Sequence, residues 1–407
     1  MKKVLALVLA VMMVMSLFAA CGNNNADNPS KDPAGNNSSN DDKNNNSDDS
    51  GSSAGVIKVG TSGPLTGGYA VYGVAVANGL ELAFEEINAL GGLQFEVRAE
   101  DDEAGADTAV NAYNALMDWG MQIMAGPTTS GSACAAAAEC AADGVFMLTP
   151  SASDAAVLSY GDNVFQICFS DPNQGKASAD YIFNNKLAEK VGVIYDSSSA
   201  YSTGIYQTFK AQADSIGLNI ETVESFTADN KADLTTQVTK CKEAGCDLLF
   251  LPLYTAENAQ VLTCMAKIGF SAKVFSCDGM DGILSVEGFD TSLAEGVMLL
   301  TPFDATATDD KTQNFVTNYT TKFGIAPNQF AADAYDVGYA IYEACTAMNV
   351  TADWSAEEIC DAMIQWFTAN SFDGITGAGM TWGADGAVSK YPMAVIIENG
   401  VYVTPEN

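Results

Sequence analysis

The 407-residue sequence contains no histidine and one arginine, Arg98. Without histidine, Ser-His-Asp and Cys-His nucleophile systems, imidazole general bases and metal sites built on imidazole are excluded. Lysine and arginine together number 18 against 51 aspartates and glutamates, which gives a formal net charge of −33. A chain this acidic offers no basic surface to replace the counterions of nucleic acid or to dock on anionic lipid, so nucleic acid is not an expected partner.

The first residues have the pattern of an export signal. Lys2 and Lys3 precede an apolar run over residues 4–17, which is short for a membrane span, and Phe-Ala-Ala-Cys follows over residues 18–21. This predicts a signal peptide over residues 1–20. The cysteine after two alanines is similar to a lipobox, in which Cys21 would carry a lipid that anchors the protein to the outer face of the cell membrane. The alternative is an ordinary signal peptide with an incidental cysteine.

A polar stretch follows over residues 21–55. Residues 22–55 hold 10 Asn, 7 Ser and 6 Asp among 34, with no Val, Ile, Leu, Met or aromatic residue. Such a composition cannot offset the entropy of ordering and predicts a disordered linker. As a flexible coil it would span about 30 Å. It is either a leash that holds a folded body off the membrane or a tail that adds only solubility.

The remaining residues, 56–407, are long enough for two sizeable cores. They carry 14 basic and 45 acidic residues, a net charge of −31 that mostly indicates a solvated surface. Cys241 and Cys246 have four residues between them, a poor spacing for a zinc knuckle, and no Cys-x-x-Cys occurs. Nine cysteines follow Cys21, an odd number that cannot all pair, and their alanine-rich and aliphatic surroundings predict mostly reduced core residues.

Short β-rich segments alternate with helical patterns. The predicted strands are 56–60, 95–99, 121–125, 145–148, 191–195, 218–223, 247–251, 273–276 and 297–300. The predicted helices are 78–89, 108–119, 133–142, 175–188, 203–215, 234–244 and 256–268. This βαβ rhythm predicts an α/β fold of two successive lobes with parallel sheets, in which ligands bind at the carboxyl ends of the strands.

Hydroxyl side chains gather where two predicted strands of the first lobe end. One cluster covers residues 127–132 and includes Ser130; the other covers residues 149–153 and includes Ser151 and Ser153. Hydroxyls and free amides at helix starts bind a carboxylate without arginine. Each cluster is equally explained by plain helix caps. The glycine-rich stretch over residues 60–68 is neither a Walker loop nor a dinucleotide fingerprint.

The second lobe offers Asp278 after an apolar strand, with Tyr201 and Tyr254 after two others. Asp278 is either a capping aspartate or the counter-ion of a cationic group. The two tyrosines are either surface aromatics or walls of a cleft. Hydroxyls on one lobe and an aspartate with tyrosines on the other would suit a zwitterion held between the lobes.

Several motifs then carry a family resemblance over about residues 56–400. They are Gly-Pro-Leu-Thr-Gly at 63–67, Gly-Leu-Glu-Leu-Ala at 79–83, Ile-Asn-Ala-Leu-Gly-Gly at 87–92, Thr-Pro-Ser-Ala-Ser at 149–153, Val-Ile-Tyr-Asp at 193–196 and Ala-Tyr-Asp at 334–336. In this order and spacing, the sequence resembles the branched-chain amino-acid-binding proteins, the periplasmic-type substrate-binding subunits of ABC importers.

The resemblance implies a type I periplasmic binding protein fold. Two doubly wound, parallel-sheet lobes would be joined by three hinge crossings, near residues 170–173, 301–304 and 389–392. Lobe 1 would comprise residues 56–170 and 303–389, and lobe 2 residues 171–302 and 390–407. The places of a family disulfide hold Glu103 and Thr129 here, so that bond is not expected.

The resemblance also implies the ligand contacts. The ligand carboxylate would be held by Ser130, Ser151, Ala152 and Ser153, and its ammonium by Asp278. Leucine and isoleucine binders of the family often have glutamate at the Asp278 position, so the shorter side chain could shift the ligand or admit another one. Aromatic walls would come from Tyr72, Tyr201, Tyr254 and Phe330.

The expectation is therefore a lipid-anchored solute-binding protein without a cofactor. As a monomer, it would deliver a neutral amino acid, branched-chain by resemblance, to an ABC permease. The alternatives are a receptor or sensor ectodomain of the same fold, or a binder of an amide, a urea-like solute or an aromatic acid. An enzyme is not expected, because a nucleophile would need a base, no histidine is available, and the serine clusters have no nearby lysine.

Overall fold

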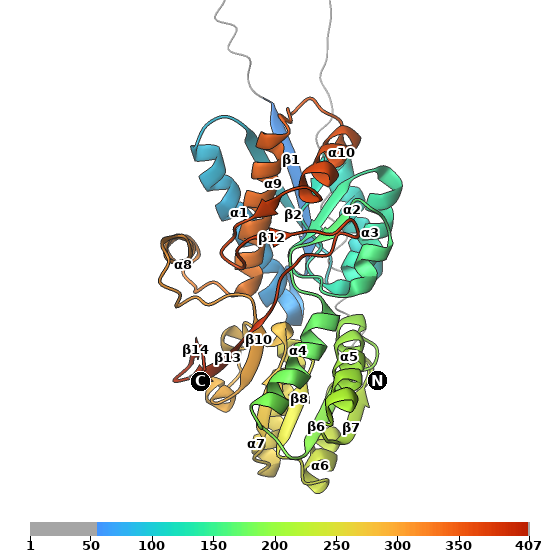
Figure 1. The fold of residues 1–407 in the computed structure, drawn as a ribbon, viewed down its shortest axis with the longest axis vertical. Helices are drawn as coiled ribbons and strands as arrows, with labels where there is room; N and C mark the ends of the chain where they lie inside the picture. The colour runs from blue at the N-terminus through green and yellow to red at the C-terminus, as the bar shows by residue number, and fades with distance from the viewer. Residues whose placement is uncertain (1–54, 406–407) are drawn as a thin grey trace, which may run out of the picture. The chain divides into compact units, whose positions relative to one another are not determined.

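Two separate β-sheets organise residues 55–405, the part of the chain that the computed structural model describes (Figure 1). The predicted signal peptide, the lipid-modified Cys21 and all of the predicted linker except Gly55 lie outside these residues. Among the described helices, none is both long and apolar enough to cross a membrane.

The first sheet has five parallel strands in the order β2-β1-β3-β4-β5. Its strands are β1 (Val56–Gly63), β2 (Gln94–Asp101), β3 (Ile123–Met124), β4 (Phe146–Thr149) and β5 (Val164–Gln166). The connecting helices are η1 (Gly67–Tyr69), α1 (Ala70–Ala89), α2 (Ala106–Trp119), α3 (Ser130–Asp143) and η2 (Ala155–Ser159). The alternation of strand and helix is the one that the sequence predicts.

A later part of the chain returns to this first sheet. It forms α8 (Asp310–Phe323), α9 (Gln329–Ala347), α10 (Ala356–Phe367) and the small antiparallel pair β11 (Ser371–Phe372) and β12 (Met380–Thr381). The core shared by β1, α1, α9 and α10 is fully buried and includes Val59, Leu80, Ile341 and Met363. Helices α1 and α9 cross closely because Gly79 has no side chain: a Cβ there would lie 2.2 Å from the Ala331 carbonyl oxygen. We call this assembly the first lobe.

The second sheet has seven strands in the order β14-β13-β10-β9-β8-β6-β7. They are β6 (Val191–Asp196), β7 (Ile220–Phe226), β8 (Leu248–Leu251), β9 (Lys273–Ser276), β10 (Met298–Thr301), β13 (Met393–Glu398) and β14 (Val401–Val403). Five are parallel, and β13 runs antiparallel to both of its neighbours. The helices are α4 (Asp171–Asn184), α5 (Ala200–Ile216), α6 (Thr235–Glu243), α7 (Thr255–Ile268), η3 (Asp278–Met280), η4 (Ile283–Ser285) and η5 (Thr291–Ala294). We call this assembly the second lobe.

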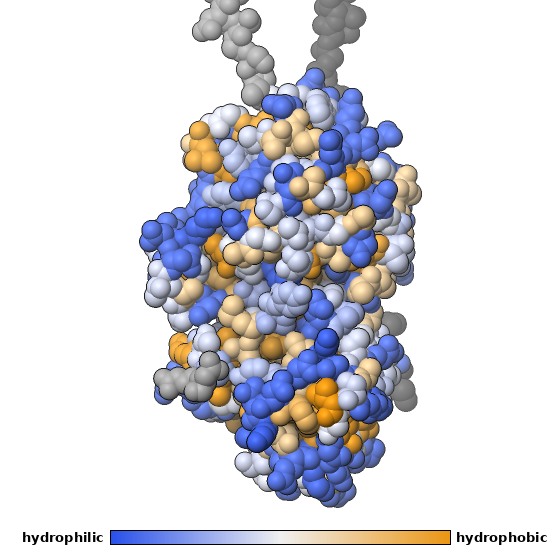
Figure 2. All heavy atoms as spheres, viewed as in Figure 1, coloured by the Kyte–Doolittle hydropathy of each residue, from blue (hydrophilic) through white to orange (hydrophobic). Residues whose placement is uncertain are grey.

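The α/β class with two helix-covered, largely parallel sheets is confirmed. The chain passes between the lobes three times: after β5, after β10 and after β12 (Figure 1). The face in Figure 2 is mostly hydrophilic with scattered apolar patches, as the acidic composition of the folded body indicates. Eight of the nine cysteines in the described residues are buried, and all nine are free thiols, in line with their predicted core role.

Candidate functional site

The two hydroxyl clusters of the first lobe lie at the carboxyl ends of β3 and β4 and are buried. Ser130 begins α3, and its hydroxyl accepts a hydrogen bond from the backbone N–H of Asp154 at 3.3 Å. The Ser151 hydroxyl donates to the Thr128 carbonyl at 2.7 Å. The two loops are thereby fixed to each other at the edge of the sheet, where ligands of parallel α/β folds bind.

The polar groups around Ala152 and Ser153 differ in their availability. The backbone N–H of Ala152 donates to the Thr149 hydroxyl at 3.0 Å, and its carbonyl accepts from the Gln166 side-chain amide at 2.6 Å. Ala152 therefore uses its backbone groups inside the first lobe. The Ser153 hydroxyl is fully buried and lies beside the Asp171 carboxylate, whose pKa it lowers, but no hydrogen bond of normal geometry engages it among the described residues.

Asp278 lies in the second lobe, two residues after β9, and is 4% exposed. Its Oδ1 accepts a hydrogen bond from the Tyr201 hydroxyl at 2.7 Å, and its backbone N–H donates to Gln174 Oε1 at 3.1 Å. Burial raises the pKa of Asp278 to about 7, although the hydrogen bond from Tyr201 and the neighbouring Gln174 side chain act in the opposite direction. A cation placed beside this carboxylate would stabilise its ionised form.

Asp171, the first residue of α4, is a second buried carboxylate that the sequence reasoning missed. It is 1% exposed, and neither of its oxygens accepts a hydrogen bond of normal geometry from the part of the chain that the structure describes. Burial raises its pKa well above the ordinary range; the neighbouring Ser153 hydroxyl acts against this rise, and the negative charge of Asp278 adds to it. The side-chain amide nitrogen of nearby Gln174 is also buried without a partner. A polar group left unpaired in this way is costly unless a ligand satisfies it.

No ion pair among residues 55–405 involves Asp171 or Asp278. Two carboxylates that share one buried region without a cation repel each other when both are ionised. The two carboxylates therefore form a site suited to a group that donates several hydrogen bonds and carries positive charge, as an ammonium does.

The four predicted aromatic walls come together from both lobes. The Tyr72 ring centroid lies 4.7 Å from that of Phe330 and 5.4 Å from that of Tyr254. Tyr254 in turn stacks on Tyr201 at 4.7 Å, with the two planes 8° apart. Tyr69, which the sequence reasoning missed, joins the cluster at 5.3 Å from Tyr254.

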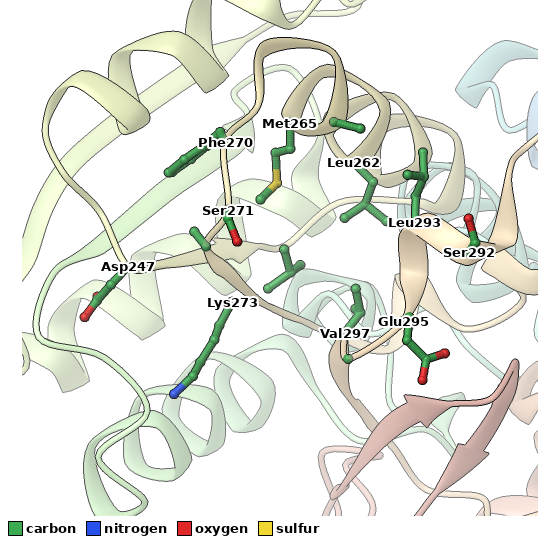
Figure 3. Close-up of a pocket in the computed structure, with 14 residues that line it drawn as sticks. Asp247, Leu262, Met265, Phe270, Ser271, Lys273, Ser292, Leu293, Glu295 and Val297 are labelled. Carbon is green, nitrogen blue, oxygen red and sulfur yellow. The ribbon is translucent and has the colours of Figure 1, made fainter.

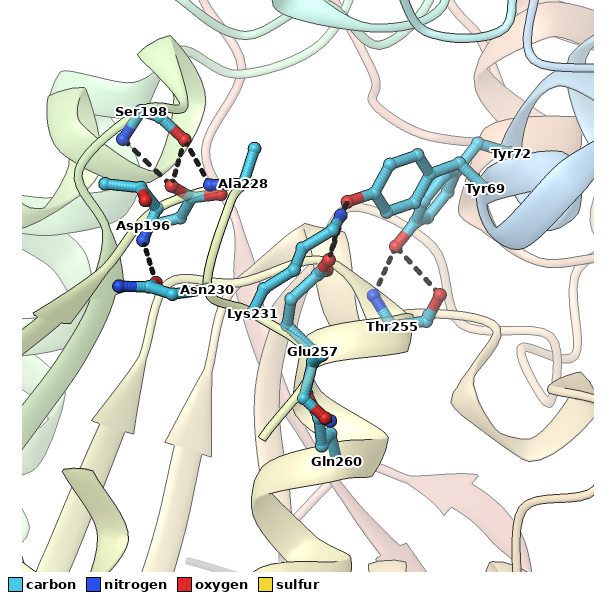
Figure 4. A network of polar contacts seen from close by, with 12 residues as sticks. Tyr69, Tyr72, Asp196, Ser198, Ala228, Asn230, Lys231, Thr255, Glu257 and Gln260 are labelled. Atoms are coloured by element: carbon cyan, nitrogen blue, oxygen red, sulfur yellow. Dashed lines mark hydrogen bonds and ion pairs between the residues drawn. The ribbon is translucent and has the colours of Figure 1, made fainter. Parts of the chain in front are cut away.

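The lobes are also joined by hydrogen bonds at this cluster (Figure 4). The Tyr72 hydroxyl donates to the Gly279 carbonyl at 2.6 Å and accepts from the backbone N–H of Thr255 at 2.6 Å. The Tyr69 hydroxyl donates to Glu257 Oε1 at 2.6 Å. Because Tyr69 and Tyr72 belong to the first lobe and their partners to the second, the structure has its lobes closed on each other.

Lys231 adds a charge to this inter-lobe contact. Its ammonium donates to the Tyr69 hydroxyl at 2.6 Å and to Glu257 Oε1 at 2.8 Å (Figure 4). Glu257 is 4% exposed, and its second carboxylate oxygen is buried without a partner among the residues that the structure describes. We call Tyr69, Lys231 and Glu257 the inter-lobe latch.

A separate surface groove of about 590 Å³ lies in the second lobe, away from these residues (Figure 3). Apolar side chains line it, among them Leu262, Met265 and Phe270, and Asp247 and Lys273 stand at one side. It contains none of the candidate site residues.

Comparison with known proteins places these features in context. The family model described as "Periplasmic binding protein" matches residues 56–400. A Leu/Ile/Val-binding protein homolog from Brucella melitensis is 32% identical over 228 residues, which cover 55% of this chain and 61% of that protein's length. A Leu/Ile/Val-binding protein from Rhizobium johnstonii is 29% identical over 260 residues, which cover 62% and 70% of the two chains.

Solved structures give the same picture. The branched-chain amino acid transporter substrate-binding protein LivJ from Streptococcus pneumoniae, solved with isoleucine, aligns with a TM-score of 0.77 at 28% identity and covers 86% of this chain and 100% of its own. An ABC-transporter solute-binding protein from R. palustris, solved with benzoate, aligns with a TM-score of 0.77 at 19% identity over 86% and 95% of the two chains. The second likeness concerns the fold alone.

Proposed function

This chain belongs to the periplasmic binding protein family and has its type I fold, and from this premise we propose that it captures a neutral amino acid between its two lobes. The observation that carries the proposal is the pair of buried carboxylates, Asp171 and Asp278, which have no cationic partner within residues 55–405. An α-ammonium supplies the missing charge and donors. The names of the relatives favour a branched-chain amino acid.

In this proposal, the ligand carboxylate is bound by Ser130, Ser151, Ala152 and Ser153, and the Ala152 N–H exchanges its Thr149 partner for the ligand. The support is their burial on adjacent strand ends and the Ser153 hydroxyl, which no hydrogen bond of normal geometry engages among the described residues. Hydroxyls and amides can neutralise a carboxylate without a charged partner. The ammonium is bound by Asp278, to which Asp171 is now added.

The apolar part of the ligand would contact the aromatic cluster of Tyr72, Tyr201, Tyr254 and Phe330. The rings of Tyr72 and Phe330 come from the first lobe and those of Tyr201 and Tyr254 from the second, so a ligand among them touches both lobes. A ligand that bridges two lobes stabilises the closed arrangement by its differential affinity for it.

The cellular role follows the family. Membership implies an extracytoplasmic location, and we propose that a lipid on Cys21 anchors the protein to the outer face of the membrane after removal of residues 1–20. Residues 21–55 would serve as the linker. As a monomer, the protein would deliver its ligand to an ABC permease, and neither a cofactor nor an enzymatic activity is part of the proposal. The proposed lobes are residues 56–170 with 303–389, and 171–302 with 390–407.

A second candidate is an aromatic acid as ligand, which the aromatic cluster favours. A sensor ectodomain is the alternative to transport. The two ligand classes can be distinguished by Asp171 and Asp278. An amino acid needs these carboxylates for its ammonium, whereas benzoate has no ammonium.

Isothermal titration of the protein with leucine, isoleucine, valine, benzoate and acetamide tests the proposal. We expect binding of at least one amino acid, and a loss of about 30-fold or more in Asp278→Asn, since breaking a buried charge pair costs about 2–5 kcal/mol. Asp336→Asn is the matched control, because Asp336 is equally buried but accepts a hydrogen bond within the first lobe, from the Ile375 backbone at 2.9 Å. Binding of benzoate alone, unchanged in Asp278→Asn, would contradict the amino-acid proposal.

A further inference from the structure

Two cysteines meet at the C-terminal end of α6, remote from the ligand site. Cys241 lies in the last turn of α6, and Cys246 follows the helix by three residues, directly before Asp247 and β8. Gly245 between them has a φ of +72°, the left-handed conformation that ends many helices. This pair is the one whose spacing in the sequence is poor for zinc.

The backbone around Gly245 forms a Schellman motif. The N–H of Cys246 donates to the Cys241 carbonyl at 3.1 Å, and the N–H of Gly245 donates to the Lys242 carbonyl at 3.0 Å. In this motif, the two residues joined by the outer hydrogen bond commonly bring their side chains into contact. Here both of those residues are cysteines, so the helix end itself brings two thiols together.

The position of Gly192 on β6 shows how close the sulfurs are. A Cβ added at Gly192 would lie 2.9 Å from the Cys246 sulfur and 3.2 Å from the Cys241 sulfur, so both sulfurs lie over one point of the strand. The pairing of β6 with β7 shifts register at this glycine. Any larger side chain at position 192 would displace the two thiols. Glycine at this position therefore provides the space that both sulfurs occupy.

We propose that Cys241 and Cys246 are a redox-active dithiol that closes to an intramolecular disulfide by exchange with a low-molecular-weight disulfide. Cys246 is the more accessible of the two, at 4% against 0% exposed, and attacks first as its thiolate. A mixed disulfide forms and one small thiol leaves. The Cys241 thiolate then attacks the Cys246 sulfur and releases the second small thiol. The protein dithiol is oxidised by two electrons, and the small disulfide is reduced to two thiols.

The surroundings set the rate of this exchange. Burial raises the pKa of both thiols, to about 12 for Cys241, and the neighbouring Lys190 partly opposes this rise at Cys246. Because the thiolate is the nucleophile, the exchange is slow at neutral pH and accelerates as the pH rises. The proposed disulfide would join the end of α6 to the residue that precedes Asp247 and β8. The carboxyl end of β8 leads to Thr255, which contacts the first lobe through Tyr72.

Peptide mapping of the oxidised protein tests the inference. The protein is incubated with glutathione disulfide at mildly alkaline pH, its free thiols are alkylated in denaturant, and tryptic peptides are identified by mass spectrometry without reduction. We expect the peptide Cys241–Lys242 to be linked to residues 243–267, with the remaining thiols alkylated. Alkylation of both Cys241 and Cys246 after this treatment, or a bond from either one to another cysteine, would overturn the inference.

Residues 243–267 also contain Cys264, so variants assign the bond. Cys264→Ala leaves one cysteine in that peptide and should preserve the link, whereas Cys246→Ala should abolish it. The oxidised wild-type protein should also melt at a higher temperature than the reduced protein, since a cross-link restricts the unfolded chain. Peptide mapping of the wild-type protein shows whether Cys241 and Cys246 form a disulfide even where a variant fails to fold.

Discussion

At the scale of single residues, Asp278 couples protonation to folding. Its pKa is about 7 in the folded, ligand-free protein and near 4 in an unfolded chain, so between these values the folded state holds a proton that the unfolded state releases. The free energy of unfolding should therefore fall as pH rises from about 4 to 7, by up to about 1.4 kcal/mol per pH unit from this group. Urea unfolding of the wild-type protein and of Asp278→Asn across this range measures the difference, and equal slopes would contradict the pKa shift.

The same residue predicts how ligand affinity depends on pH. An ammonium ligand requires the ionised carboxylate, so binding should weaken as pH falls below about 7, approaching tenfold per pH unit. Titration calorimetry with the amino acid that binds best measures this dependence. A ligand without an ammonium would lack it, which separates the two ligand classes independently of any variant.

Asp171 should affect stability and binding in opposite directions. Asp171→Asn removes a buried carboxyl that must take up a proton when the ligand-free protein folds at neutral pH, because burial raises its pKa. The ligand-free variant should therefore be more stable, by about 1–3 kcal/mol. Amino-acid affinity should fall, because one acceptor for the ammonium loses its charge. Chemical denaturation and calorimetry measure the two effects, and a variant with lower stability and unchanged affinity would assign Asp171 a purely structural role.

The sequence did not reveal Asp171 because an aspartate beside a proline at a helix start is typical of a cap or a turn. Its burial depends on the approach of the two lobes at the first crossing, which is a tertiary property. Tyr69 and Glu257 were missed for the same reason, since each gains its partner from the other lobe. The serine clusters and Asp278 were found because strand ends are recognisable from local pattern, although their role as ligand contacts stays a prediction.

At the scale of elements, the inter-lobe latch joins η1 to α7 and to the loop after β7. Lys231→Met removes an ammonium that contacts both Tyr69 and Glu257, and so should destabilise the closed arrangement. Because Lys231 is 36% exposed, the effect should be small, an increase of about two- to fivefold in the rate of ligand release. Stopped-flow measurement of release tests this prediction.

Lys240→Met is a suitable control for the latch. Lys240 forms an ion pair with Glu224 at 2.7 Å, but both residues belong to the second lobe. Removing this pair should leave the release rate unchanged. If both variants released ligand equally fast, the effect would reflect a general loss of positive charge rather than the contact between lobes.

The elements up to β10 were largely predictable, because strand and helix alternate with clear periodicity, whereas α8, α9 and α10 were not predicted. Helix α1 begins at Ala70, eight residues before the predicted start at Asn78, because the small and apolar residues between them pack against the sheet and against α9. Strand β5 was missed because its three residues are too few to show an alternation of apolar and polar side chains. Strand β13 was missed because it joins the second sheet from a distant part of the chain.

At the scale of the whole molecule, the third crossing is fixed by a buried ion pair. Lys390 lies in this crossing, and its ammonium donates to Asp333 of α9 at 2.6 Å and to the Thr376 hydroxyl at 2.6 Å. The two charged side chains are 1% and 3% exposed. Burial raises the pKa of Asp333 to about 6, while Lys390 opposes this rise, so the carboxylate stays ionised at neutral pH chiefly because the lysine is present.

Lys390→Met should therefore destabilise the protein by about 3–5 kcal/mol, because Asp333 is left buried without its partner. The double variant Lys390→Met/Asp333→Leu should recover most of that loss, since an apolar pair of similar volume often replaces a buried ion pair without a net cost. Chemical denaturation at neutral pH measures both free energies. If the double variant were as unstable as the single one, the pair would stabilise the crossing through its geometry and its contact with Thr376. If the double variant recovered the free energy of unfolding, the crossing would need neither the ion pair nor its geometry, but only the absence of an unpaired buried charge.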